Sequence, residues 1–304
     1  MENINTAATQ TSALPEVQKE NNGKKKSVSF LVAKIIVFVL FALYAFTLFY
    51  AMLYAISLAL KTQLEYDDSL VGLPKSWKFS NFTKAFTAVQ ANDKNMVVMF
   101  INSVWYALGG AALGALTSAV VAYIVSKYKF PGRKIFYGMA LVCMMIPIVG
   151  AFPSQYRVYR TLGILDTPLL LVTKMAGFGF NFIVLFSFFK TLSWTYAEAG
   201  FIDGASHLRV FVKIMLPMAL PVMGSLFLVS TVQLWNEYME PNLFLQSFPT
   251  LASGLYIFQS QMVRNMNYPL LFAGLIVSVL PVIVLFILFQ KVMMESMSVG
   301  GIKG

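Results

Sequence analysis

The amino-acid sequence predicts an all-α polytopic membrane protein with six transmembrane helices. Hydrophobic residues make up 58% of the 304 residues and charged residues only 12%, whereas about a quarter of the residues in a soluble domain carry charge. The apolar residues form long runs, and a bilayer-spanning helix needs roughly 20 of them. Five runs contain no charged residue: 35–60, 96–126, 135–156, 214–236 and 265–290. Composition and run length together exclude an ordinary soluble domain.

A sixth apolar run, 167–189, is interrupted only by Lys174. The apolar run that follows the lysines at 24–26 is about twice as long as the core of a signal peptide, so it predicts an uncleaved first span. The polar residues 1–28 are expected to form a disordered N-terminal tail, and 29–304 a transmembrane domain. The six spans are predicted at 33–59, 97–125, 135–153, 168–190, 219–243 and 268–290.

The positive charges predict which side of the membrane each loop occupies. Lysines at 24–26 and Lys34 lie at the start of the first span, and the loop 127–134 holds four Lys or Arg and no acid. Since cytoplasmic loops are enriched in Lys and Arg, both chain ends and the loop 191–220 are expected to be cytoplasmic. The loop 61–95, with five lysines beside four acids, is evidence against this assignment.

The net charge of +10 could also suggest a nucleic-acid partner. The basic residues are, however, dispersed around the predicted spans instead of forming one patch. The bias of Lys and Arg toward cytoplasmic loops accounts for such a distribution. No nucleic-acid partner is therefore predicted.

The second span carries a glycine pattern that resembles a phosphate-binding loop only superficially. Gly109 and Gly114 have the spacing of such a loop, but Ala115 and Leu116 stand where Lys and Ser or Thr are required, and no strand precedes them. Gly110 and Gly114, with Ser118 one turn later, instead favour close packing of helices in lipid. If ATP drives this protein, another chain is expected to hydrolyse it.

Two features of the third and fourth spans bear on the shape of the bundle. Pro147 and Pro153 remove backbone donors and favour bends, which often line transport pathways.

Lys174 lies about two turns into the fourth span. A charge there is either functional or extends to the membrane interface, and the sequence favours the interface.

The end of the fifth span places aromatic and polar side chains together. Trp235, Asn236, Glu237 and Tyr238 follow Pro217 by about 18–21 residues, which is roughly 27 Å or more along a helix. Rings beside amides and carboxylates suit ligands rich in hydroxyl groups. These four residues are candidates for a transport pathway, and a helix end emerging into water is the alternative.

A polar break at 196–221 separates the fourth and fifth spans. Two short helical segments are predicted on either side of Asp203 and Gly204, a turn signal. The first segment is rich in small residues, which would let another protein approach closely. In the second, Leu208, Phe211, Val212 and Met215 form one apolar stripe. A solvated loop between helices is the alternative.

The chain offers no set of residues for catalysis or metal binding. His207 has no second His, Cys or carboxylate at ligand spacing, and Cys143 lies alone within an apolar run. No nucleophile with a matching base can be assembled from the spans. The sequence therefore predicts no enzyme and no metal site.

Several motifs in order resemble a known family. They are the loop 127–134, Met145-Ile146-Pro147, Glu198-Ala199 followed by Asp203-Gly204-Ala205 and Ile214-x-Leu216-Pro217, Trp235-Asn236-Glu237, and the terminal 300–304. The chain resembles the inner-membrane permease of ABC importers of the type I fold, in the carbohydrate-uptake group typified by the MalG subunit of the maltose system. The resemblance extends from about residue 70 to the C-terminus, with a core over about 95–292.

The resemblance implies that the loop 191–220 contains a coupling helix that docks on an ATPase subunit. The family usually has Ala where this chain has Gly200, and since Gly costs a helix about 1 kcal/mol relative to Ala, the docking could be looser. The residues implied to dock are Glu198, Ala199, Gly200, Asp203, Gly204, Ala205, Ile214, Leu216 and Pro217.

The resemblance further implies a complete transport machine in the bacterial plasma membrane. This chain would pair with a second, homologous permease and form half of the pathway for a sugar or oligosaccharide delivered by an external solute-binding protein. Two separate ATPase subunits would bind ATP and Mg, so the chain itself would hold no cofactor. The alternatives are a permease for another solute and a secondary transporter, which would require an inverted repeat and ionisable residues at the membrane midplane.

Overall fold

The computed structural model describes residues 28–145, 150–261 and 267–300. It divides into two units, Met1–Met52 and Leu53–Gly304, which are described separately. The tail predicted over 1–28 falls almost wholly outside the described ranges, as do Pro147 and the terminal 301–304. In the first unit the described residues form one apolar helix, the start of α1 (Val28–Ala59).

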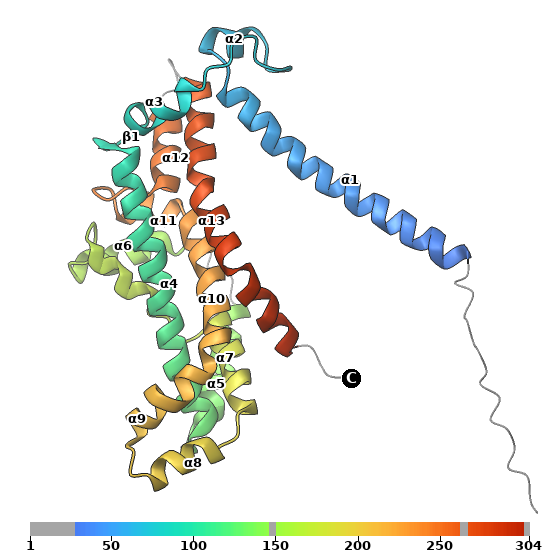
Figure 1. Cartoon of the computed structure of the whole chain (residues 1–304). Helices are drawn as coiled ribbons and strands as arrows, with labels where there is room; N and C mark the ends of the chain where they lie inside the picture. The colour runs from blue at the N-terminus through green and yellow to red at the C-terminus, as the bar shows by residue number, and fades with distance from the viewer. Residues whose placement is uncertain (1–27, 146–149, 262–266, 301–304) are drawn as a thin grey trace, which may run out of the picture. The chain divides into compact units, whose positions relative to one another are not determined.

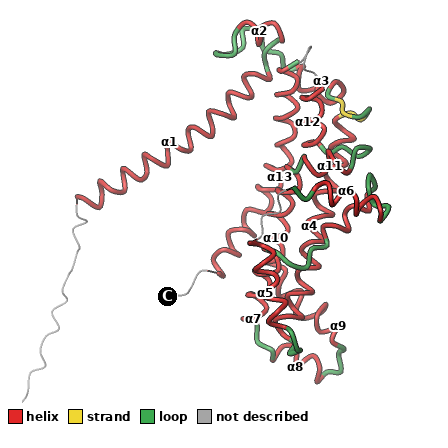
Figure 2. Tube along the Cα trace, turned by 180° about the vertical axis from the view of Figure 1, so that it is seen from behind, coloured by secondary structure: helices red, strands yellow, loops and turns green. Residues whose placement is uncertain are grey.

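The second unit is built almost entirely of helices (Figures 1 and 2). A short antiparallel hairpin precedes the long helix α4. Its two strands, β1 (Gln90–Ala91) and β2 (Lys94–Asn95), have two residues each, and Gln90 pairs with Asn95. The helical elements are α2 (Gln63–Asp68), α3 (Ser80–Ala88), α4 (Met96–Lys127), α5 (Arg133–Met145), α6 (Phe152–Thr161), η1 (Pro168–Lys174), α7 (Phe180–Thr191), α8 (Thr195–Ile202), α9 (His207–Val210), η2 (Phe211–Met215), α10 (Leu216–Asn236), α11 (Met239–Phe244), α12 (Leu251–Gln261) and α13 (Tyr268–Gly300).

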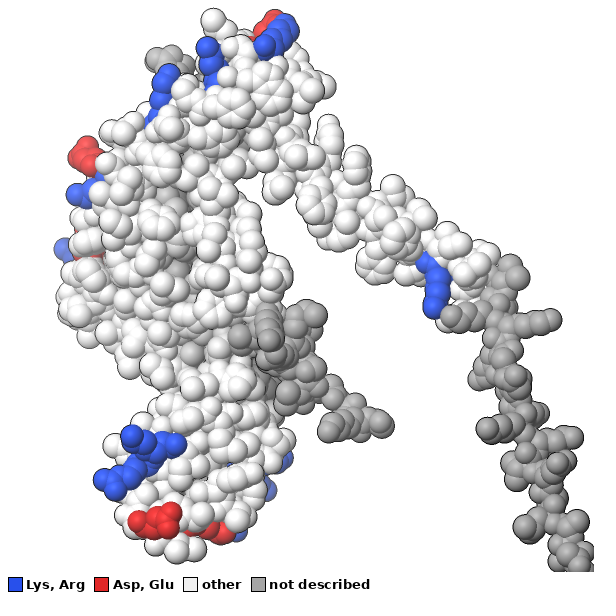
Figure 3. All heavy atoms as spheres, viewed as in Figure 1, with Lys and Arg blue, Asp and Glu red and all other residues white. Residues whose placement is uncertain are grey.

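The core lies where α4, α7 and α10 pack together. Phe182, Phe189 and Met215 are fully buried there. A second cluster, including Met99, Trp235 and Phe258, joins α4, α10, α12 and α13. Figure 3 shows a broad band without visible charged side chains between two charged ends of this unit. A band of this kind suits contact with the apolar interior of a bilayer.

Among the described residues, four helices are long and apolar enough to cross a membrane: Phe30–Ala59, Met96–Lys127, His207–Asn236 and Tyr268–Gln290. They correspond to the predicted first, second, fifth and sixth spans. The close packing predicted for the second span is confirmed. A β-carbon on Gly110 would stand 2.8 Å from Leu234 Cδ1, and Ser118 Oγ donates to the Ala176 carbonyl at 3.0 Å.

The fourth predicted span, 168–190, is wrong as one continuous helix. It consists of η1 and α7, separated at residues 175–179. Gly179 has φ +134°, which ends any helix, and a β-carbon on Gly177 would stand 2.9 Å from Val121 Cγ2. The third predicted span contains α5, whose 13 residues end at Met145, before the undescribed residues 146–149.

The predicted limits of the fifth span, 219–243, are also wrong. The helix starts earlier, because α9, η2 and α10 follow one another without a break from His207. It ends earlier, at Asn236. The Glu237 carboxylate accepts hydrogen bonds from the backbone N–H groups of Met239 and Glu240, at 2.9 and 3.1 Å, which starts the separate helix α11.

Candidate functional site

The polar break forms a tight turn between α8 and α9. Gly204 has φ +76°, a conformation that glycine adopts without steric penalty. Its N–H donates to the Phe201 carbonyl at 3.0 Å, and the Ala205 N–H donates to the Gly200 carbonyl at 2.9 Å. This pair of bonds is the Schellman motif that ends many helices. The Ser206 side chain then caps α9 by accepting from the Arg209 N–H.

One face of α8 packs against the helix that follows the turn. Ala197 and Gly200 are buried. A β-carbon on Gly200 would stand 2.7 Å from Ile214 Cδ1 and 3.1 Å from Val210 Cγ2. Gly200, where the resembling family has Ala, therefore lets α8 lie close against this chain's own helix.

The opposite face of α8 and the turn form what is here named the α8–α9 surface. It is exposed and mixes apolar with acidic side chains. Ile202 is 85% exposed and Leu208 is 71% exposed. Large exposed apolar side chains of this kind are candidates for a protein contact when they belong to one patch. The α8–α9 surface consists of the exposed residues Tyr196, Glu198, Ala199, Ile202, Asp203, Gly204 and Leu208.

The nine predicted docking residues thus occupy different environments. Four of them, Glu198, Ala199, Asp203 and Gly204, lie on the α8–α9 surface. Gly200 is buried against the following helix. Ala205, Ile214 and Leu216 are half-buried, and Pro217 is exposed at the base of the long helix.

A short π-helix, η2, joins the α8–α9 turn to α10, and sequence reasoning missed it. The Leu216 N–H donates to the Phe211 carbonyl. Pro217 follows directly and has no N–H to continue the ladder, which is the signal for an irregular turn here. Turns of this kind occur frequently at functional sites.

The α8–α9 turn is tied to the end of α4 by aromatic contacts. The Tyr128 hydroxyl and His207 Nδ1 are hydrogen-bonded at 2.9 Å. The rings of Phe201 and His207 lie 4.7 Å apart, and those of Tyr128 and Trp194 lie 5.8 Å apart. The Lys127 ammonium also donates to the Leu192 carbonyl. The histidine therefore has a structural role, and movement of the turn would be transmitted to α4.

A cavity of about 520 Å³ lies among α4, the η1–α7 break and α10. Its lining is mostly apolar, and it is here named the polar cavity after the three polar side chains Asn181, Ser230 and Gln233 in its wall. Asn181 Nδ2 donates to Ser230 Oγ at 3.3 Å. Gly110 and Gly114 form part of the α4 wall of the cavity. Sequence reasoning missed these three polar residues. Their signal is a single amide or hydroxyl within an otherwise apolar run, which is costly in lipid and therefore a candidate for function.

A largely buried ion pair includes Lys174, one of the residues that line this cavity. The Lys174 ammonium bonds to Glu240 Oε2, and the two side chains are only 16% and 18% exposed. The Tyr106 hydroxyl also donates to Glu240 Oε2, at 3.2 Å. The Lys174 ammonium therefore has a carboxylate partner 66 residues later in the chain, and its extension to the membrane interface stays a prediction.

The four pathway candidates do not face one common space. Trp235 is 5% exposed, and its Nε1 donates to the Ser278 carbonyl at 3.1 Å. The Glu237 carboxylate starts α11, as described above. Asn236 and Tyr238 are exposed, and the Tyr238 ring lies 4.9 Å from that of Tyr256. None of the four lines the polar cavity, and a pathway role for them stays a prediction.

Comparison with known proteins gives consistent matches. Residues 110–298 match the family model for the "Binding-protein-dependent transport system inner membrane component". The diacetylchitobiose uptake system permease protein NgcG of Streptomyces coelicolor is 32% identical over 82% of each chain. The arabinooligosaccharides transport system permease protein AraQ of Bacillus subtilis is 29% identical over 76% of this chain and 81% of that protein.

Two further proteins extend the comparison. The maltodextrin transport system permease protein MdxG of Bacillus subtilis is 30% identical over 75% of this chain and 82% of that protein. The fold also matches a chain in the crystal structure of a bacterial ABC transporter involved in the import of the acidic polysaccharide alginate. The TM-score is 0.71 and the identity 24%, over 87% of this chain and 98% of that one.

Proposed function

Because the chain belongs to the family of binding-protein-dependent transport system inner membrane components, we propose that it is a permease subunit of an ATP-driven importer for a sugar or oligosaccharide. It would form half of the translocation pathway, together with a second, homologous permease. The observation that carries the proposal is the α8–α9 surface, an exposed face of apolar and acidic side chains, in a sequence that contains no ATP-binding loop.

In this proposal α8 is the coupling helix. An ATPase subunit that binds ATP and Mg contacts Glu198, Ala199, Asp203 and Gly204, and the Tyr128–His207 contact transmits its movement to α4. The long helix from His207 to Asn236 carries the same movement toward the polar cavity. Rigid-body rocking of this kind is a common basis of alternating access.

The topology completes the proposal. The chain crosses the bacterial plasma membrane six times, with α5 and the η1–α7 region supplying the third and fourth crossings and with both termini in the cytoplasm. An extracytoplasmic solute-binding protein delivers the cargo to the opposite side. The irregular backbone at 175–179 fits this topology, because such backbone is tolerated at membrane depth where it lines a cavity.

A carbohydrate cargo is supported by two observations. Three of the relatives are named as permeases for diacetylchitobiose, arabinooligosaccharides and maltodextrin. The polar cavity presents Asn181, Ser230 and Gln233, whose amide and hydroxyl groups both donate and accept hydrogen bonds as sugar hydroxyls do.

The test is purification of the tagged chain from its own membranes with the subunits that accompany it. The assembly is reconstituted in liposomes with the solute-binding protein, and ATP hydrolysis is measured over a panel of saccharides, amino acids and peptides. The proposal expects stimulation and uptake for at least one saccharide. Stimulation by amino acids or peptides alone would reject the sugar cargo, and purification without an ATPase subunit would reject the importer.

A further inference from the structure

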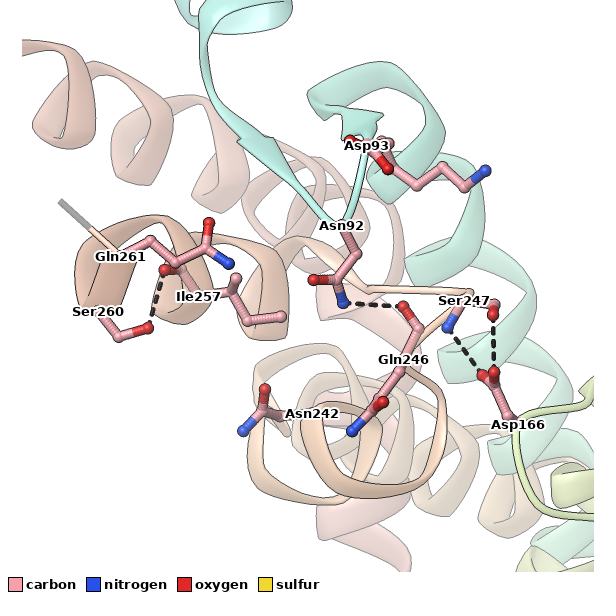
Figure 4. A pocket seen from close by; sticks show the side chains of 10 residues that line it. Asn92, Asp93, Asp166, Asn242, Gln246, Ser247, Ile257, Ser260 and Gln261 are labelled. Carbon is pink, nitrogen blue, oxygen red and sulfur yellow. Dashed lines mark hydrogen bonds between the residues drawn. The ribbon is translucent and has the colours of Figure 1, made fainter.

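A second hollow lies where the β1–β2 hairpin meets α11 and α12 (Figure 4). These elements are at the end of the second unit opposite the α8–α9 turn (Figure 1). Its volume is about 590 Å³, within the range of small-molecule sites. Figure 4 shows that its walls come from four separate parts of the chain. None of the residues discussed above as pathway or docking candidates lines this hollow.

Hydrogen bonds between these separate segments fix the walls. The Asp166 carboxylate accepts from the Ser247 N–H at 2.8 Å and from the Ser247 hydroxyl at 2.6 Å. Asn92 Nδ2 donates to the Gln246 carbonyl at 2.9 Å. The hairpin, the loop before η1 and the segment after α11 are therefore held in one arrangement, and the hollow is a built feature of the fold.

Three side-chain amides around the hollow are not used by the fold. Asn242, Gln246 and Gln261 line it, and within the described part of the chain their amide groups have no hydrogen-bond partner (Figure 4). Each amide offers one accepting oxygen and two N–H donors. Their combined capacity matches a ligand whose neighbouring groups both donate and accept.

The charges of the hollow disfavour an anionic ligand. Asp93 and Lys94 are adjacent and of opposite sign, and Asp166, whose carboxylate accepts from Ser247, adds a second negative charge. Ile257, which is 8% exposed, contributes a small apolar area to a lining that is otherwise mostly polar. Hydroxyl groups together with an apolar C–H face are the features of a sugar ring.

We propose that this hollow, the rim pocket, binds a neutral mono- or disaccharide directly through Asn242, Gln246 and Gln261. The inference rests on the proposed function and deepens it, since it places a saccharide subsite on this chain at the end opposite the ATPase. A saccharide released at that end would be held there before it reaches the polar cavity.

The test uses a cysteine reporter on the rim pocket. In a Cys143→Ser background, Ser260→Cys places a thiol on the pocket wall and leaves all three amides intact, because the Ser260 hydroxyl bonds only within its own helix, to the Ile257 carbonyl. The purified assembly is labelled with a maleimide in the presence of maltose, cellobiose or diacetylchitobiose, without the solute-binding protein. Thr87→Cys, exposed on α3 outside the pocket, is the control reporter.

The proposal expects at least one disaccharide to slow labelling of Ser260→Cys and not of Thr87→Cys. Adding Asn242→Ala and Gln246→Ala should raise the disaccharide concentration that gives half-maximal protection about tenfold. This corresponds to about 1.4 kcal/mol of binding free energy. The control variant Gln90→Ala removes an exposed amide outside the pocket and should leave this saccharide concentration unchanged. Lack of protection by every saccharide would overturn the proposal.

Two outcomes separate this inference from neighbouring ones. Protection by the sugar-free binding protein but by no saccharide would show a protein-docking surface and overturn the saccharide site. After the labelling, the solute-binding protein is added to the same preparation and ATP hydrolysis is measured. Sugar-stimulated hydrolysis without protection would reject the rim pocket alone, whereas protection without stimulation in the presence of the binding protein would reject the transport function and keep the pocket.

Discussion

Gly200 of α8 and Ile214 of η2 lie so close that a β-carbon on Gly200 would stand 2.7 Å from Ile214 Cδ1. The two residues set the position of α8 against the long helix that starts at His207. The α8–α9 surface therefore rests on a packed layer and not on a free loop. That arrangement is what a rigid coupling device requires.

A large side chain at Gly200 should displace α8. Gly200→Leu is expected to destabilise the chain by about 1–3 kcal/mol, the usual range for overpacking, seen as a lower temperature of thermal unfolding in detergent. Ala199→Leu is the matched control, because Ala199 is exposed on the neighbouring position. Equal unfolding temperatures for the two variants would contradict the packing assigned to Gly200.

A charge at Gly204 should uncouple transport without unfolding the chain. No atom lies within 4 Å of the position of an added β-carbon, and Asp and Asn both tolerate its positive φ. Gly204→Asp is expected to lower uptake at least tenfold, because a carboxylate would enter the proposed contact with the ATPase. Gly204→Asn, which differs by the charge alone, should retain most of the uptake. Normal uptake by the Asp variant would remove Gly204 from the contact.

The Lys174–Glu240 pair should respond more strongly to single than to double substitution. Lys174→Met or Glu240→Gln leaves one buried charge without its partner, which costs about 3–5 kcal/mol. The double variant removes both charges and should be closer to the original stability. Thermal unfolding of the unsubstituted chain, the two single variants and the double variant gives the coupling free energy between Lys174 and Glu240. Additive effects of the two single substitutions would argue against a direct pair.

Gln233 should influence the cargo and not the motor. Gln233→Leu removes the amide from the polar cavity and is expected to reduce uptake several-fold while the ATPase subunit still co-purifies. Val232→Leu, on the neighbouring position outside that cavity, should have little effect. Unchanged uptake kinetics in Gln233→Leu would exclude the cavity from the pathway.

Hydrophobic runs were sufficient to predict α4, α10 and α13, because an uninterrupted apolar run in lipid can satisfy its backbone only as a helix. The α8–α9 turn was also predictable, since Asp203 and Gly204 form a local signal. The break between η1 and α7 was not, because mean hydropathy does not register the backbone conformation of Gly179.

Contacts between distant parts of the chain were beyond reach of a single sequence. Lys174 and Glu240 are 66 residues apart, and nothing in either segment predicts the other. Asp166 and Ser247, which fix the rim pocket, are 81 residues apart. Trp235 was grouped with Asn236 by adjacency, but successive residues on a helix point in different directions, and the structure buries Trp235 and exposes Asn236.

The most direct test of the account is a cross-link from Ile202, 85% exposed at the centre of the α8–α9 surface. In a Cys143→Ser background, Ile202→Cys is treated in native membranes with a thiol–amine cross-linker, and the adduct is identified by mass spectrometry. The account predicts an adduct with an ATPase subunit from Ile202→Cys and none from Thr87→Cys at the opposite end. The absence of an ATPase adduct from Ile202→Cys, or equal adducts from both positions, would contradict it.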